Sequence, residues 1–316
     1  MFVSQFLSLE GAQLPGLLAF AGVLFAFLLV RYVAIVGPLY LVCWKLLRGR
    51  LKGRRIQRTS PPRARVLKEF AWSLATFVVF SLVGVATLLM SRAGWTQRYH
   101  SIDERGWLYW AASVALMLVV HDAYFYWTHR FMHLRGVFRY FHRVHHLSFN
   151  PSPWAAFSFH PLEAVVEAGI VFVIALIMPF HPSALFAFLI IMTIMNGLGH
   201  LGYELYPRGF ARGRLGRWVT TSVHHNMHHH YVHGNYGLYF TWWDRLMGTM
   251  HRQYDETFDA VTSRGSAARG GGDRSGPDGR DGRDGHDGRD GRDDQGAGRA
   301  VSRAASAELA AQRNPK

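Results

Sequence analysis

Histidines are the residues of this sequence whose spacing predicts chemistry. The chain contains 18 of them, and most lie between His121 and His233, where three clusters read HRFMH, HRVHH and HNMHH. Residues four apart share one face of a helix and lie about 5 to 6 Å apart, which suits two imidazoles that bind one metal ion. The clusters therefore predict a metal site with the candidate ligands His129, His133, His142, His145, His146, His225, His228 and His229.

The number of imidazoles indicates more than one metal ion. One such pair arises by chance or at a membrane surface, but a buried set without a cation leaves unsatisfied groups that cost about 1 to 3 kcal/mol each. His200, at the end of an apolar run, is a further candidate ligand. Neutral imidazole suits zinc, copper, iron and nickel alike. The single cysteine, Cys43, excludes a cysteine-based site, and no H-E-x-x-H zinc protease motif is present. These residues alone predict a dinuclear, all-nitrogen site.

Five apolar runs must position these histidines. Hydrophobic residues make up 49% of the chain and charged residues 18%, against about 25% charged in a typical soluble domain. A spanning helix needs about 20 mostly apolar residues, and the runs near this length are Leu17–Trp44, Phe70–Met90, Trp107–Val120, Ala164–Phe180 and Ala184–Leu198. We expect an all-α integral membrane protein with four or five membrane helices. The first run reads as a retained anchor, and the last two form a hairpin that either spans the membrane or re-enters it.

The charge pattern predicts on which side the histidines lie. The net charge is +14, and much of the excess falls between the first two runs, at Lys45, Arg48, Arg50, Lys52, Arg54, Arg55, Arg58, Arg63, Arg65 and Lys68. Such a cluster marks a cytosolic loop rather than a nucleic-acid site. Counting crossings from this loop brings every histidine cluster to the cytosolic face, in a helical cap. We interpret the loop as a topology signal that contacts anionic lipids, and docking of an acidic electron donor is the alternative.

Three regions follow from this pattern. Residues 1–106 hold the first membrane helices and the basic loop, and residues 107–263 hold the histidine clusters and the hairpin. Residues 264–316 contain the repeat GPDGRDGRDGHDGRDG and almost no large apolar side chains. Such a segment cannot bury enough apolar surface to fold, so we expect a disordered tail.

The three histidine boxes, in order and with their flanks, resemble the fatty acid hydroxylase and sterol desaturase superfamily of membrane di-iron enzymes. The segments HRVHHLSFNPSPWAAFSFHPLE and HGNYGLYFTWWDRLMGT are similar to the family's sequences after its second and third boxes, and the resemblance runs from about Leu118 to Thr249. Within the superfamily it is closest to the C-5 sterol desaturase, or lathosterol oxidase, branch. The resemblance identifies the eight box histidines as iron ligands and adds His200 as a ninth.

The resemblance also implies the reaction. It implies two non-haem iron ions, O₂ as co-substrate, and a lipid substrate that gains a hydroxyl group or a double bond. Electrons would come from a small cytochrome or a ferredoxin with its reductase. The compartment would be the inner membrane of a bacterium or the endoplasmic reticulum of a eukaryote. The lipid, whether sterol, hopanoid, fatty acyl or related, is left open, as is the choice between hydroxylation and desaturation.

Several residues and two other classes of function stay open. Asp122 either accepts the second ring N–H of a ligand or is a helix-end carboxylate in water, and Asp244 fixes a turn or pairs with Arg245. The roles of His160 and His224 are undetermined. A metal transporter would place its histidines within the spanning helices near the midplane, and a non-catalytic membrane scaffold would carry a degenerate site.

Overall fold

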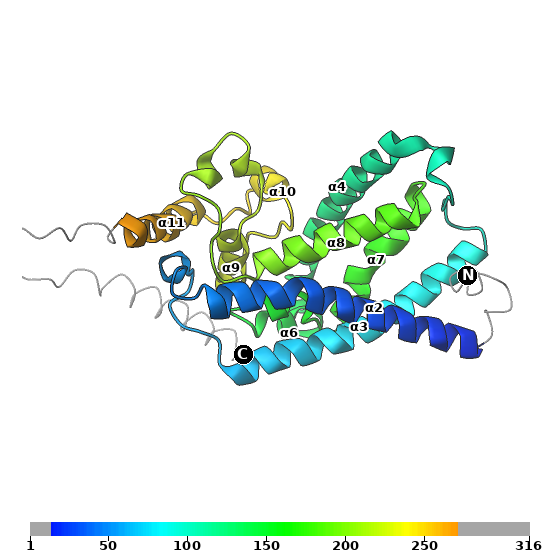
Figure 1. Cartoon of the computed structure of the whole chain (residues 1–316), viewed down its shortest axis with the longest axis horizontal. Helices are drawn as coiled ribbons and strands as arrows, with labels where there is room; N and C mark the ends of the chain where they lie inside the picture. The colour runs from blue at the N-terminus through cyan, green and yellow to red at the C-terminus, as the bar shows by residue number, and fades with distance from the viewer. Residues whose placement is uncertain (1–13, 271–316) are drawn as a thin grey trace, which may run out of the picture. The chain divides into compact units, whose positions relative to one another are not determined.

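The computed structural model describes residues 14–270, and within them the chain is helical (Figure 1). The described residues form no strand, only three isolated bridges. The α-helices are α2 (Leu14–Tyr40), α3 (Arg63–Arg92), α4 (Gly106–Met132), α5 (Phe138–Phe141), α6 (Arg143–His146), α7 (Pro161–Ile177), α8 (Pro182–Gly199), α9 (Ser222–Tyr231), α10 (Trp242–Leu246) and α11 (Tyr254–Gly270). The predicted start of the tail at residue 264 falls inside α11, and residues 271–316 lie outside the described residues.

Four of these helices are long and apolar enough to cross a membrane. They are α2 with the π-helical turn that extends it to Leu46, then α3, α4 and α8. Their outward surfaces carry exposed apolar side chains such as Leu18, Val78 and Leu108, and Trp95 and Trp107 are exposed where α3 ends and α4 begins, as is common at a membrane–water interface. The predicted all-α membrane class is confirmed.

The hairpin of α7 and α8 runs between the two ends of this helix bundle. Both helices begin with proline at the first helical position, where its missing N–H costs nothing, after a histidine that caps the helix: His160 before α7 and His181 before α8. At its tip, Tyr99 N–H donates to Phe180 O (3.1 Å) in a pairing that joins the hairpin to the segment between α3 and α4. The other end of α8 leads into His200. The 17 residues of α7 correspond to about 25 Å.

The first two helices share their core with the histidine region. Leu28, Tyr32 and Phe77 from α2 and α3 pack in one buried cluster with Phe125 of α4 and Phe157 of a 3₁₀ turn, Pro153–Phe157. Tyr32 also donates from its hydroxyl group to Trp154 O (2.6 Å). Residues on either side of the predicted boundary at residue 106 therefore pack into one core, and the N-terminal helices border the histidine region.

Beyond α8, a compact cap carries the last histidine box. Val223 and Met227 of α9 are buried against Tyr254, Phe258 and Val261 of α11, and α9, α10 and α11 lie together in Figure 1. The side chain of Thr221 caps α9 by accepting a hydrogen bond from His224 N–H (3.2 Å). Side chains of this kind satisfy N–H groups that have no partner within the helix, so the box starts on a fixed turn.

Candidate metal centre

All nine histidines predicted as ligands come together, in two groups. The five-histidine group consists of His129, His133, His142, His146 and His228, and the four-histidine group consists of His145, His200, His225 and His229. Within each group the ligand nitrogens lie within 4.8 Å of one another. The two groups adjoin, since the rings of His146 and His229 are 4.9 Å apart between centroids.

The two H-x-x-H-H boxes divide their histidines between the groups in opposite ways. In the second box, the outer pair, His142 and His146, belongs to the five-histidine group and His145 belongs to the other. In the third box, the outer pair, His225 and His229, belongs to the four-histidine group and His228 belongs to the five-histidine group. Each box therefore gives its i, i+4 pair to one group and its remaining ring to the other, which ties the two groups together.

Three rings of the five-histidine group are held by acceptors at Nδ1. His129 Nδ1 lies 2.9 Å from Tyr236 O, His228 Nδ1 lies 2.8 Å from Gly234 O, and His142 Nδ1 lies 2.5 Å from Glu163 Oε1. A carbonyl oxygen only accepts, and a neutral imidazole carries one ring proton. The proton of His129 and of His228 must therefore be on Nδ1, and each Nε2 presents a lone pair.

The Nε2 atoms of this group approach one another in pairs. The Nε2 atoms of His129 and His142 are 2.9 Å apart, and those of His146 and His228 are 3.0 Å apart. Nε2 of His129 has no proton to share, because the proton of that ring is on Nδ1, and Nδ1 of His142 is engaged by Glu163. Two lone pairs at this distance repel each other unless a cation lies between them.

The four-histidine group shows the same convergence. His200 Nδ1 lies 2.8 Å from Asn196 O, which leaves its Nε2 as a lone pair. The Nε2 atoms of His225, His229 and His145 surround it at 3.0, 3.1 and 3.3 Å. The single lone pair on His200 Nε2 cannot accept hydrogen bonds from three imidazole nitrogens at once. The Nε2 atoms of His225 and His229 also face each other, at 3.1 Å.

The donor set fits a metal ion in each group. Two nitrogens that each bind an ion at about 2.1 Å, close to a right angle, lie about 3 Å apart, which matches the observed separations. Burial, and then the neighbouring histidines, lower the pKa of His142, His145, His146, His225, His228 and His229 well below the usual range. Neutral imidazole is the form that binds metal. These imidazoles are therefore in the neutral form that binds metal, and their nitrogens have the separation that metal binding needs.

Asp244 holds the turn whose carbonyls face the ligands. Its carboxylate accepts hydrogen bonds from Tyr236 N–H (2.9 Å), Gly237 N–H (2.8 Å) and the Thr249 hydroxyl (2.7 Å), so it fixes a turn. Arg245 instead donates to the backbone oxygen of Arg217. Burial alone would raise the pKa of Asp244, but the contacts with His224, Thr249 and Gly237 lower it to about 2.

His224 and Asp122 are supporting residues. His224 Nε2 lies 3.2 Å from Asp244 Oδ2, and neither metal group includes His224. Both roles considered for Asp122 are wrong. This residue is fully buried rather than in water, and it accepts from the backbone N–H groups of Tyr239 (2.9 Å) and Phe240 (3.1 Å) rather than from a histidine.

Glu163 is the functional residue that sequence reasoning missed. It is fully buried in the first turn of α7 and binds His142, as described above. The signal was present, because Glu163 follows the segment FHP at the start of a predicted apolar run. Glutamates are common in first turns for their interaction with the helix dipole, so position alone did not separate the two roles. His160, in the same segment, caps α7 and belongs to neither metal group.

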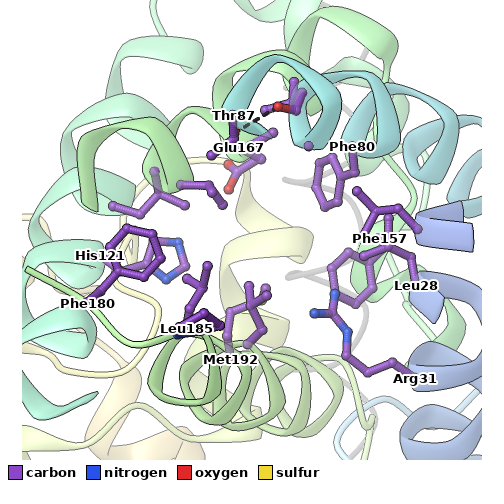
Figure 2. Close-up of a pocket in the computed structure, with 18 of the residues that line it drawn as sticks. Leu28, Arg31, Phe80, Thr87, His121, Phe157, Glu167, Phe180, Leu185 and Met192 are labelled. Carbon is purple, nitrogen blue, oxygen red and sulfur yellow. Dashed lines mark hydrogen bonds between the residues drawn. The ribbon is translucent and has the colours of Figure 1, made fainter. Parts of the chain in front are cut away.

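A largely apolar cavity of about 380 Å³ lies within the helix bundle, separated from the metal centre by aromatic side chains (Figure 2). At its inner end, Phe125 packs against the ring of His129 (centroids 4.9 Å apart) and Phe159 against that of His145 (5.2 Å). Along α2 its lining extends from Phe20 to Arg31, a rise of about 16 Å. The cavity therefore has the length and the apolar lining to hold an extended apolar molecule.

The comparisons with known proteins agree with this site. Residues 114–249 match the sequence model of the fatty acid hydroxylase family. The chain is 31% identical over 188 residues to Delta(7)-sterol 5(6)-desaturase ERG3B of Gibberella zeae, covering 60% of this chain and 56% of that protein. It is 27% identical over 187 residues to lathosterol oxidase of Mus musculus, covering 58% of this chain and 61% of that protein. The predicted resemblance is confirmed.

The match has a limited extent. The chain spans between about half and two thirds of the length of these relatives, and the family match covers the region from the middle of α4 to the turn after α10. This region contains all nine candidate ligands. No solved structure gives a significant match to the chain.

Proposed function

We propose that this protein is a membrane-bound lipid oxidoreductase of the sterol desaturase and fatty acid hydroxylase type. We propose that the nine histidines hold two iron ions. The observation that carries the proposal is the approach of the His129 and His142 Nε2 atoms to 2.9 Å, while Nδ1 of both rings is engaged elsewhere. A cation accounts for this geometry, and the matched family and relatives support iron and a lipid substrate.

The proposed division of work is between the irons and the chain. When bound, the irons supply the activation of O₂ that an unactivated C–H bond requires. Hydroxylation consumes one O₂, two electrons and two protons, and gives the alcohol and one water. Desaturation consumes the same and gives the alkene and two waters. Asn196 O and the carbonyls of the 234–236 turn fix the proton on Nδ1 of the ligands they contact, and Glu163 orients His142. The apolar cavity excludes water and orients the lipid.

The electron donor is proposed to approach from the cytosolic side. The basic residues of the loop between α2 and α3 place that loop in the cytosol by the positive-inside rule. Arg54 of this loop donates to Glu204 O (3.4 Å), just after the four-histidine group's His200, and Ile56 N–H donates to Gly202 O (3.1 Å). The loop and the metal centre therefore lie on one side, where a small cytochrome or ferredoxin would deliver electrons.

The histidines do not lie where a transporter would need them. Of the nine, only His129 lies within one of the four helices that could cross the membrane. The other eight lie past the helix ends, away from any midplane path. A non-catalytic scaffold has no need for two groups of converging imidazole nitrogens suited to a cation. An enzyme is therefore the function that the geometry supports best.

A comparison of lipid extracts tests the proposal. Cells that express the chain, cells without it, and cells that express the variant His145→Ala are analysed by mass spectrometry. We expect a lipid that has gained one oxygen atom or lost two hydrogen atoms in the first cells only. If no lipid changes although the purified chain contains iron and an electron donor is present, the proposed activity is wrong.

A further inference from the structure

Arg31 is a buried cation in a cavity that is otherwise largely apolar. It lies on α2, its exposed fraction is 4%, and its guanidinium group points into the cavity in Figure 2. Its Nε and Nη1 atoms have no hydrogen-bond partner, and within residues 14–264 no carboxylate forms an ion pair with it. The guanidinium group therefore has buried donors without a partner at the wall of the cavity.

The contacts of Arg31 with aromatic rings orient its guanidinium group but provide no hydrogen-bond acceptor for its N–H donors. Its Cζ atom lies 5.8 Å from the ring centroid of Phe27 and 6.0 Å from that of Phe157. Aromatic rings attract a cation, but a guanidinium group has five N–H donors, and burying them unpaired is costly. A molecule in the cavity with an oxygen acceptor would complete this site.

Arg31 lies toward the end of the cavity next to the metal centre. The ring of Phe157, which it faces, is 6.2 Å from the ring of Phe159, and that ring is 5.2 Å from His145. The cavity's other arginine, Arg98, belongs to the opposite end, where its backbone pairs with that of Phe180. The two arginines therefore mark the two ends of one cavity, and Arg31 is the more deeply buried of them.

We propose that Arg31 binds the oxygen-bearing end of the lipid, a hydroxyl or a carboxylate group, and that the lipid lies with this end toward the metal centre. The apolar body then extends along α2 and α3 toward Phe20 and Arg98. The carbon that is oxidised lies near the head group rather than near the tail. This proposal rests on the proposed function for the identity of the cavity's occupant, and it adds the occupant's direction and the chemistry of its head.

Pairs of probes that differ only in the head group test the proposal. The full-length chain is placed in lipid nanodiscs without O₂ or electron donor, so that binding is measured without turnover. The probes are cholestanol against cholestane, and stearate against octadecane. Because a hydrogen bond to a charged group contributes about 1.5 to 3 kcal/mol, we expect the oxygen-bearing member of one pair to bind roughly 10- to 100-fold more tightly. The pair that shows this difference tells a hydroxyl head from a carboxylate head.

Two arginine variants decide which end holds the head. We expect Arg31→Gln to remove the preference and leave hydrocarbon binding unchanged, Arg31→Lys to retain part of it, and the control Arg98→Gln to retain it fully. Loss of the preference in Arg98→Gln instead of Arg31→Gln would overturn the proposal. So would the absence of any preference in the unaltered chain, a result that stands even if Arg31→Gln does not fold. A preference in this binding experiment, together with no oxidised lipid in the comparison of lipid extracts, would contradict the proposed function and leave the head-group site in place.

Discussion

The two histidine groups differ in how their rings are fixed. In the five-histidine group, His129, His142 and His228 each have an Nδ1 acceptor, and one of these acceptors is the carboxylate of Glu163. In the four-histidine group, His200 has a backbone acceptor, whereas the Nδ1 atom of His229 has no partner. The first group therefore has three rings held at Nδ1, one of them by a side-chain carboxyl group, although Nδ1 of His133 and of His146 has no partner; in the second group His200 is held in this way.

This difference teaches that the two metal sites need not be equal. An acceptor at Nδ1 orients the ring and makes the opposite nitrogen a better ligand. We therefore expect the five-histidine group to hold its ion more tightly, and the four-histidine group to lose its ion first to a chelator. The largest effects should come from removing ligands, and smaller ones from removing the residues that orient them.

Removing one ligand from either group should have the largest effect. We expect His228→Ala, in the five-histidine group, and His145→Ala, in the four-histidine group, each to reduce product formation to background, because the reaction needs both ions. Membrane insertion and helix content should stay unchanged, as measured by fractionation and circular dichroism. Full activity in either variant would refute the ligand assignment.

Removing the carboxylate at the five-histidine group should weaken metal binding without abolishing it. We expect Glu163→Gln to lower the iron affinity of this group by about 10- to 100-fold, as loss of a residue that orients a ligand commonly does. The matched control is Glu167→Gln, one helical turn further along α7, where the side chain lines the cavity and belongs to neither metal group. Chelator titration measures the affinity, and an equal loss in both variants would contradict the role of Glu163.

Acid should act on the five-histidine group through Asp244. The carboxyl pKa falls from the usual 3.8 to about 2 in the folded chain, so its contribution is complete above about pH 4 and is lost as the pH falls toward 2. The shift corresponds to about 2 kcal/mol of folding stability. We expect Asp244→Asn to be destabilised by about this amount at neutral pH. Its free energy of unfolding should also fall less than that of the unaltered chain as the pH falls toward 2. Unfolding of the detergent-solubilised chain measures the stability at neutral pH and its loss in acid. If the variant loses as much stability in acid as the unaltered chain, Asp244 is not the cause of that loss.

A smaller effect is expected at Asp122, which supports the chain beyond the same turn. It accepts two backbone N–H groups, and a hydrogen bond to a charged group contributes about 1.5 to 3 kcal/mol. Because Asn retains one acceptor oxygen, we expect Asp122→Asn to cost about 1 kcal/mol while both groups keep their iron. Loss of iron in this variant would show that Asp122 acts on the ligands.

Deletion of residues 271–316 should have the smallest effect. The family match and both metal groups lie before this segment, and its composition predicts that it adds no packed core. We expect product formation within about twofold of the full chain, at equal protein levels. A large loss of activity would show that the tail has a role that its composition does not predict.

The sequence allowed the ligands to be predicted, but not their grouping. Repeated spacing indicated the eight box histidines, because residues four apart share a helix face, and His200 was added from its position at the end of an apolar run and from the resemblance. Their division depends on how the short helix α6 and the helix α9 are turned toward each other, so that His145 and His228 each cross to the other group. Local spacing contains no information on that tertiary arrangement.

The supporting residues were harder to predict for the same reason. Asp122 lies on a strongly apolar helix, and its partners at Tyr239 and Phe240 are far away in the chain. Arg31 lies within the first apolar run, where its position alone indicates no role, and it lines a cavity built from several helices. The membrane helices themselves were predictable, since hydropathy alone defines them.

The iron content of purified chains tests the central claim most directly, that two groups of histidines from distant segments each hold one ion. Metal analysis by mass spectrometry is applied to the unaltered chain and to the double variant His225→Ala/His229→Ala, which removes the outer pair of the third box from the four-histidine group. The account predicts about two irons per chain in the first and about one in the second, held by the intact five-histidine group. A single iron in the unaltered chain, or two in the double variant, would contradict it.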